Sequence, residues 1–210
     1  MIRLVQPAAL AVVLALSILG SGCAPVVIAG AAAGGVSVAA DRRLTDVQVA
    51  DERIEWQSSS RVSDKLKDQG HVNVTSYNKM VLLTGEATTE AMRSEAEKLT
   101  AATPEVKSVV NDIQIGAPTS MSSRSNDAYL TSVVKTRFVG EQKFNPLHVK
   151  VVTENSVVYL LGLVTRKEAD DATNIARHVG GVKRVVRVFE YIPDPPPAAA
   201  KPAAAPAAKN

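Results

Sequence analysis

Cysteine, histidine and aromatic residues are scarce in this chain of 210 residues, which has one cysteine, three histidines and 4% aromatic side chains. No pair of histidines has the spacing of metal ligands, and the lone Cys23 cannot complete a zinc site with them, so we expect neither a metal nor a cofactor. With so few aromatic rings, the core must be aliphatic, mostly Val, Leu and Ala. The net charge of +3 is mild, and it suits an anionic surface without requiring a nucleic acid partner.

The uninterrupted apolar run at residues 8–19 is too short to span a bilayer comfortably. It follows Arg3, the only charged residue before Cys23, and ends in small residues, which is typical of a secretory signal. We expect residues 1–22 to be a lipoprotein signal and Cys23 to carry the lipid, palmitate included. An unpaired cysteine in an exported protein would otherwise be a reactive liability. Gly20 stands where such signals usually have Leu, and the alternative is an ordinary cleaved signal with a spare thiol.

The central feature of the sequence is a repeat. Residues 71–85 read HVNVTSYNKMVLLTG, and residues 148–162 read HVKVVTENSVVYLLG, 77 positions later. Alternating valines followed by a continuous apolar run predict a β-hairpin in each copy, with Asn78 and Asn155 in the tight turns. Gly85 and Gly162 are expected to let backbone pack closely at the strand ends.

Helical patterns surround each hairpin. Apolar spacing predicts first helices at 51–67 and 127–140, the latter capped by Ser125 or Asn126, and second helices at 86–103 and 163–179. A third strand follows near 106–110 and near 182–186. The fold class is therefore α+β, with two αββαβ units that each pack a three-stranded mixed sheet on two helices. We call them the first unit (51–115) and the second unit (127–192).

Other segments connect or flank the units. Residues 23–50 form the lipidated N-terminus and tether, residues 116–126 read as a linker, and the Pro/Ala-rich residues 193–210 are expected to be disordered. Trp56 lies off the apolar stripe of its helix, and we expect it to cover the core edge or to contact the second unit. Asp51 and Glu52 are expected in the first turn of that helix, where they suit its dipole.

The repeated pattern resembles the BON domain, and two such units behind a lipoprotein signal resemble the dual-BON outer-membrane lipoproteins of Gram-negative bacteria. The likeness rests on stretches such as DRRLTDVQVAD, HVNVTSY, VKVVTEN and LLGLVTRKEA, and extends over about 23–192. It implies a lipid-anchored outer-membrane protein that faces the periplasm and supports envelope integrity, with recruitment to sites such as the division septum. No catalytic constellation is present in the sequence, so we expect no enzyme.

The first helix of one unit differs from the first helix of the other in the residues that are expected to face outward. Arg53, Gln57 and Ser63 of the first unit correspond to Tyr129, Val133 and Val139 of the second, at an offset of 76. Charge changes in the same direction: residues 51–115 carry eight basic and eleven acidic side chains, whereas residues 127–192 carry ten and seven. A basic, apolar helix surface can bind anionic lipid headgroups. The alternative is that these apolar residues pack against the first unit.

The resemblance implies that the helix binds anionic phospholipid, with Tyr129 and Val139 in the contact surface. The expected phospholipid site comprises Tyr129, Val133, Lys135, Arg137, Val139 and Gly140. The protein would act as a monomer on an anionic phospholipid membrane. The alternative function is a protein-interaction module that binds an envelope assembly or cell-wall partner through the same helix.

Overall fold

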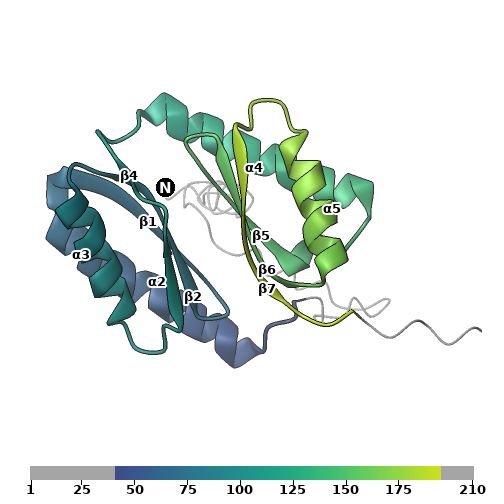
Figure 1. Ribbon diagram of the computed structural model, residues 1–210, viewed down its shortest axis with the longest axis horizontal. Helices are drawn as coiled ribbons and strands as arrows, with labels where there is room; N and C mark the ends of the chain where they lie inside the picture. The colour runs from purple at the N-terminus through teal and green to yellow at the C-terminus, as the bar shows by residue number, and fades with distance from the viewer. Residues whose placement is uncertain (1–40, 195–210) are drawn as a thin grey trace, which may run out of the picture. The chain divides into compact units, whose positions relative to one another are not determined.

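The computed structural model describes residues 41–194, and both αββαβ units lie within them (Figure 1). In the first unit the elements are α2 (Thr45–Leu66), the 3-10 turn η2 (Lys67–Gln69), β1 (Gly70–Tyr77), β2 (Met80–Ala87), α3 (Glu90–Ala101), β3 (Ser108–Asn111) and β4 (Gln114–Ile115). In the second they are α4 (Met121–Glu141), η3 (Pro146–His148), β5 (Val149–Glu154), β6 (Val157–Val164), α5 (Arg166–Arg177) and β7 (Arg184–Tyr191). The predicted fold class is confirmed.

Each hairpin closes through a two-residue turn. Asn78 and Lys79 have φ angles of 53° and 68°, and Asn155 and Ser156 have 47° and 64°. Two consecutive residues with positive φ form the tight turn whose twist matches that of paired strands, and Asn tolerates this conformation better than most residues. The predicted turns are therefore confirmed.

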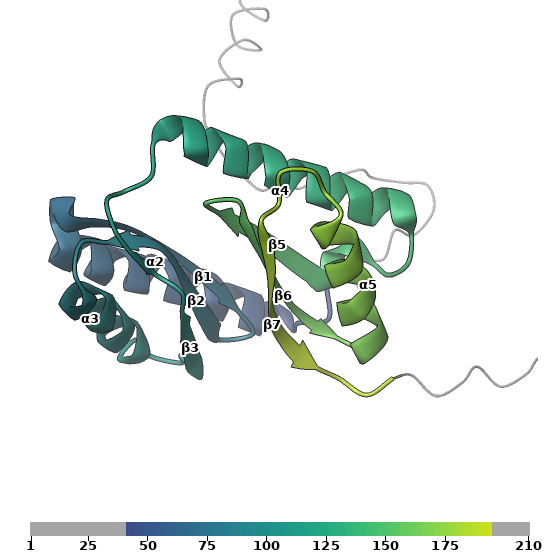
Figure 2. The same ribbon diagram turned by 45° about the horizontal axis from the view of Figure 1, so that its top comes forward.

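The third strand of each unit returns beside the hairpin and pairs in parallel with its second strand. Residues 108–111 pair with 80–83 in the first unit, and 184–191 pair with 157–164 in the second. In the first unit the ladder is interrupted at Asp112 and Ile113 and resumes in β4. The crossover runs through α3 or α5, so each unit has two helices on one face of its sheet (Figures 1 and 2).

The central strands β2 and β6 are apolar along both faces because both faces are buried. In β2, Val81 and Leu83 point into the core beneath α2 and α3, whereas Leu82 points the other way. In β6, Val158 and Leu160 point to α4 and α5. A third cluster combines residues from both sheets: Tyr77, Leu82, Tyr159, Leu161 and Val188. The two units therefore meet through the sheet faces that their own helices leave uncovered.

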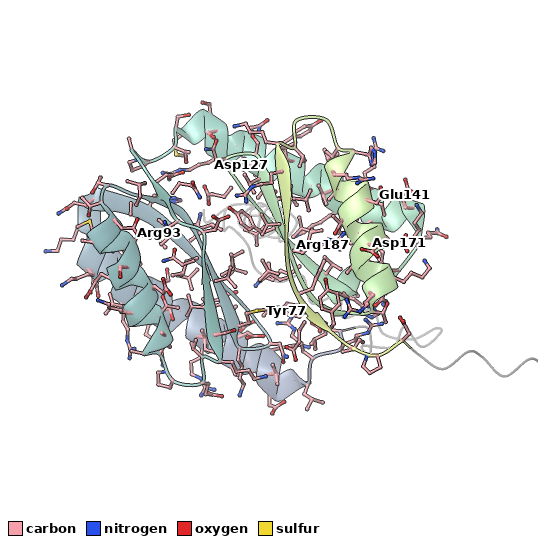
Figure 3. All side chains as sticks on the ribbon, viewed as in Figure 1. Tyr77, Arg93, Asp127, Glu141, Asp171 and Arg187 are labelled. Atoms are coloured by element: carbon pink, nitrogen blue, oxygen red, sulfur yellow. The ribbon has the colours of Figure 1, made fainter. Side chains whose placement is uncertain are left out.

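Polar contacts surround this third cluster. Tyr77 lies between the two sheets (Figure 3). Its hydroxyl donates a hydrogen bond to the carbonyl of His148 at 3.4 Å, and the Tyr159 hydroxyl donates one to Asp112 Oδ2 at 2.9 Å. Arg184 also contacts Asp112, at 3.0 Å. The hydroxyl groups of both tyrosines thus form hydrogen bonds across the interface.

Helix α4 is longer than predicted. It begins at Met121, so six of the residues assigned to the linker, 121–126, are helical. Ser120 caps the helix, because its hydroxyl accepts the Ser123 N–H at 3.2 Å, and Ser125 lies inside it. The cluster of serines thus marks a helix N-terminus as well as a loop.

Helix α2 also begins earlier than predicted, at Thr45 rather than Asp51. Asp51 and Glu52 are therefore in the middle of the helix, and the expected interaction with its dipole is wrong. The predicted role of Trp56 is wrong as well, since its side chain is 73% exposed. The helices α3 and α5 are shorter than expected because β2 and β6 extend to Ala87 and Val164.

Among residues 41–194, no helix is long and apolar enough to cross a membrane. The signal segment, Cys23, most of the tether and nearly all of the Pro/Ala tail lie outside the described residues.

Candidate lipid-docking surface

Helix α4 presents one buried and one exposed face. Its buried residues, Leu130, Val134 and Phe138, recur at the spacing of one helical turn and pack into the core of the second unit. Phe144 packs edge-on against Phe138, with ring centroids 5.0 Å apart, and covers the end of that core. This anchoring fixes the direction in which the remaining side chains of α4 point.

The exposed face carries two large apolar side chains. Tyr129 is 65% exposed and Val139 is 62% exposed. Residues ten apart on an α-helix differ by about 80° around the axis, so both flank the outward direction. Both side chains lie outside the core, on a face of the helix that also carries Ser132 and Thr136, and we call this face the ridge of α4.

Two basic residues flank this ridge. Lys135 and Arg137 are both exposed, and neither forms an ion pair with a described residue. Because they are two positions apart, they project about 200° apart around the helix, one on each side of the ridge. The acidic residue nearby, Glu141, lies 3.5 Å from Lys143, which offsets its charge.

The structure brings together four of the six predicted site residues in one shallow depression. It is lined by Tyr129, Ser132, Val133, Thr136, Arg137, Gly140 and Glu141. Lys135 and Val139 lie outside it, on the adjoining flank of the helix. Val133 is only partly exposed, since it packs against the core of the second unit, and Gly140 has open space where a side chain would be.

The exposures of Tyr129 and Val139 bear on the alternative that the extra apolar residues of α4 pack against the first unit. Both residues are mostly solvent-exposed, and the first unit contacts the second through the sheet faces instead. That alternative is therefore wrong for this pair.

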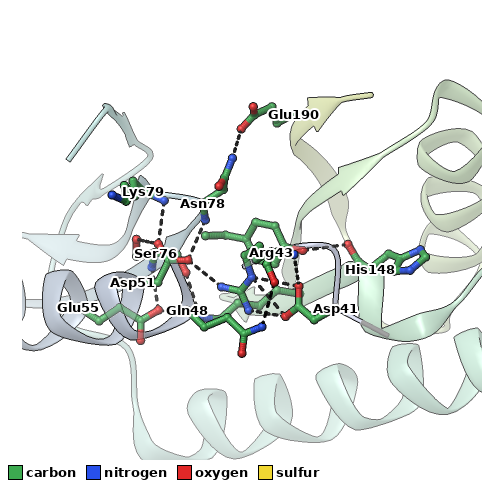
Figure 4. A network of polar contacts seen from close by, with 12 residues as sticks. Asp41, Arg43, Gln48, Asp51, Glu55, Ser76, Asn78, Lys79, His148 and Glu190 are labelled. Atoms are coloured by element: carbon green, nitrogen blue, oxygen red, sulfur yellow. Dashed lines mark hydrogen bonds and ion pairs between the residues drawn. The ribbon is translucent and has the colours of Figure 1, made fainter. Parts of the chain in front are cut away.

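Residues 41–43, the segment before α2, belong to a network of polar contacts (Figure 4). Arg43 contacts Asp41 at 2.8 Å and Asp51 at 2.7 Å, and its guanidinium lies 4.1 Å from the centre of the Tyr77 ring. Its neighbour Arg42 donates two hydrogen bonds to Glu168 of the second unit, at 2.6 and 2.9 Å. Residues 41–43 thus clamp the junction of the two units.

Glu168 is the strongly perturbed acid of this clamp. Burial alone would raise its pKa, but hydrogen bonds from Arg42, the Thr165 backbone and His148 lower that pKa to about 2. Glu168 also closes a capping box with Thr165 at the start of α5. Nδ1 of His148 lies 3.3 Å from Oε1 of Glu168, so this histidine belongs to the contacts that hold the Glu168 carboxylate in place.

The described residues contain one group that could hold a metal ion. Ligand atoms of His71, Glu86 and Glu154 all lie within 4.8 Å of one another. Sequence reasoning missed this group because its members come from three different strands with no common spacing.

Comparison with known proteins identifies the two units. The BON domain family model matches residues 50–117 and 126–193. The outer membrane lipoprotein DolP of Haemophilus influenzae is 35% identical over 185 residues, which cover 87% of this chain and 95% of that protein.

Two further proteins are similar in sequence. A 21 kDa hemolysin of Actinobacillus pleuropneumoniae is 33% identical over 72% of this chain and 79% of its own length. The osmotically-inducible protein Y of Escherichia coli is 31% identical over 117 residues, which cover 54% of this chain and 58% of that protein. The chain belongs to the BON domain family, as a protein with two tandem BON domains of the same kind as DolP.

Proposed function

We propose that this protein is a non-catalytic outer-membrane lipoprotein whose second BON domain docks on anionic phospholipid through α4. The lipid on Cys23 would hold it to the membrane, facing the periplasm. The name of the Haemophilus relative supports the lipoprotein assignment. A role in envelope integrity, with recruitment to anionic lipid at the division site, belongs to the same proposal.

The observation that carries the docking proposal is the exposed ridge of Tyr129 and Val139 between two cations without ion-pair partners among the described residues. Tyr favours the membrane–water interface, because its ring is apolar and its hydroxyl is polar. Each Lys or Arg near an anionic leaflet contributes about 1 kcal/mol. The two cations together therefore correspond to roughly a 30-fold difference in affinity between anionic and neutral membranes.

The experiment is co-sedimentation of a fragment spanning residues 41–192 with vesicles. The fragment lacks Cys23, so binding reports on the folded domains alone. We expect binding to vesicles with anionic phospholipid, little binding to zwitterionic vesicles, and weaker binding as salt rises, because salt screens exposed charges. Absence of binding to anionic vesicles at low salt would contradict the proposal.

Salt dependence also separates lipid from protein as the partner. A mainly apolar contact with an envelope protein should persist at salt concentrations that release the fragment from anionic vesicles. Retention of an envelope protein on α4, without any vesicle binding, would favour the protein-interaction module instead.

A further inference from the structure

A group of three potential metal ligands lies where the two BON domains meet. His71 in β1 and Glu86 in β2 are directly opposite each other in the antiparallel ladder. Glu154, the last residue of β5, comes from the second domain. The ligand atoms of all three residues lie within 4.8 Å of one another, so a single ion could reach them.

Each residue of this group has one nitrogen or oxygen atom that forms no hydrogen bond with a described residue. His71 Nδ1 is buried and receives or donates no hydrogen bond among residues 41–194. Glu86 Oε2 accepts the Thr119 backbone N–H at 3.1 Å. Glu154 Oε2 accepts from Asn73 at 2.6 Å. No described residue donates to the Oε1 atom of either carboxylate.

The hydrogen bonds to the Oε2 atoms resemble the outer contacts that orient metal-binding carboxylates. One oxygen of each carboxylate is thus held by the protein, while the other is free to coordinate. A buried imidazole nitrogen without a partner is costly, and a metal ion would satisfy it.

The charge balance also favours a cation. Glu86 and Glu154 are only 4% and 6% exposed. Two carboxylates this close repel each other, and a bound cation would offset that repulsion.

Arg124 is the one Lys or Arg that lines the cavity beside this group, and its charge opposes the binding of a second positive charge. It lines the same cavity of about 410 Å³ as His71 and Glu154, together with Asp127. The carboxylates of Glu86, Glu154 and Asp127 outnumber this arginine. The cavity itself provides a route by which an ion could enter.

We propose that His71, Glu86 and Glu154 bind a divalent transition-metal ion of the Zn²⁺ type that links the two BON domains. One imidazole nitrogen with two carboxylates suits Zn²⁺, with water in the remaining position, whereas Mg²⁺ and Ca²⁺ prefer oxygen ligands alone. Because the ligands come from both domains, the ion would stabilise their mutual arrangement.

Calorimetry with Zn²⁺ on the mature full-length protein, purified in a non-ionic detergent and freed of metal by a chelator, tests the proposal. We expect one Zn²⁺ per chain, and an affinity at least about ten-fold lower in His71→Ala and Glu154→Gln. Mg²⁺ and Ca²⁺ should give no comparable binding. The control is His178→Ala, which removes an exposed histidine outside the group and should bind Zn²⁺ like the unmodified protein.

Thermal unfolding provides the second readout. Zn²⁺ should raise the unfolding temperature of the unmodified protein and of His178→Ala, but not that of His71→Ala. Unfolding without metal shows whether each variant is folded. Equal Zn²⁺ affinity in His71→Ala and the unmodified protein, or no Zn²⁺ binding by the unmodified protein, would overturn the proposal. Neither result would affect the vesicle experiment, which concerns α4.

Discussion

Asp51 and Asp127 occupy equivalent positions 76 residues apart, and each carboxylate holds the hairpin turn of its own domain. Asp51 accepts the backbone N–H groups of Asn78 and Lys79 at 2.8 and 2.7 Å. Asp127 accepts those of Asn155 and Ser156 at 2.9 and 2.8 Å. Both carboxylates are buried. Each first helix is thus attached to its hairpin by the same charged contact.

The first prediction concerns Asp127→Asn. The amide retains one acceptor oxygen but places an NH₂ group where the second oxygen accepted a backbone N–H. Because hydrogen bonds to charged groups contribute about 1.5–3 kcal/mol, we expect the unfolding free energy to fall by about 2 kcal/mol. Urea unfolding of the 41–192 fragment measures this change.

The control for that variant is Asp170→Asn, whose carboxylate is exposed and pairs only with Arg187 at 2.8 Å. Surface substitutions of this kind usually change stability by less than about 0.5 kcal/mol. Similar losses in the two variants would mean that the turn contact of Asp127 contributes no special stability.

The second prediction concerns Gly85, which has a φ of +107°. A Cβ added there would lie 2.0 Å from the carbonyl oxygen of His71. Gly85→Ala therefore combines backbone strain with a clash against main chain that cannot rotate away, and we expect a loss of at least about 3 kcal/mol. The matched variant is Gly140→Ala in α4, where nothing lies within 4 Å of the new Cβ.

Gly140→Ala should leave stability unchanged or raise it by up to about 1 kcal/mol, because alanine is the better helix former. Chemical unfolding of both variants is the measurement. A native-like stability in Gly85→Ala would show that the strand ends do not approach as closely as described.

The third prediction concerns pH. The pKa of Glu168 is lowered from an ordinary value of 4.5 to about 2, so the folded state favours its charged form. An acid with a depressed folded pKa adds stability that is complete above its unfolded pKa and disappears as pH falls through its folded pKa. Unfolding free energy should therefore decrease as pH is lowered from about 4.5 towards 2.

Arg42→Gln removes the guanidinium that contributes most to lowering this pKa. The unfolding free energy of this variant should therefore fall less than that of the unmodified fragment as the pH is lowered. Lys167→Gln is the control, because Lys167 forms an exposed pair with Asp171 instead. Urea midpoints measured at pH values on both sides of this window test the prediction. An identical pH dependence in Arg42→Gln and the unmodified fragment would contradict the role of the clamp.

Much of the fold could be predicted because local patterns and the repeat agree. The Asn turns, the alternating valines and the doubly buried central strands each follow from short stretches of sequence. The start of α4 could not be predicted correctly, because serines favour loops and helix N-termini alike, and only the contact of Ser120 with Ser123 separates the two.

Contacts between distant residues were beyond local patterns. The clamp of Arg42 on Glu168 joins residues 126 positions apart, and the group of His71, Glu86 and Glu154 joins three strands. The candidate lipid surface was accessible to sequence reasoning because comparing the two copies of one helix shows which apolar residues the fold does not require. Its lipid partner stays a prediction.

The most direct test of the docking surface is the co-sedimentation of Tyr129→Glu with anionic vesicles, beside Trp56→Glu. Trp56 is an exposed aromatic residue on the corresponding helix of the first domain, so the two variants add the same charge at comparable sites. We predict that Tyr129→Glu loses most of the binding, whereas Trp56→Glu binds like the unmodified fragment. Undiminished binding by Tyr129→Glu, or an equal loss in both variants, would contradict docking through α4.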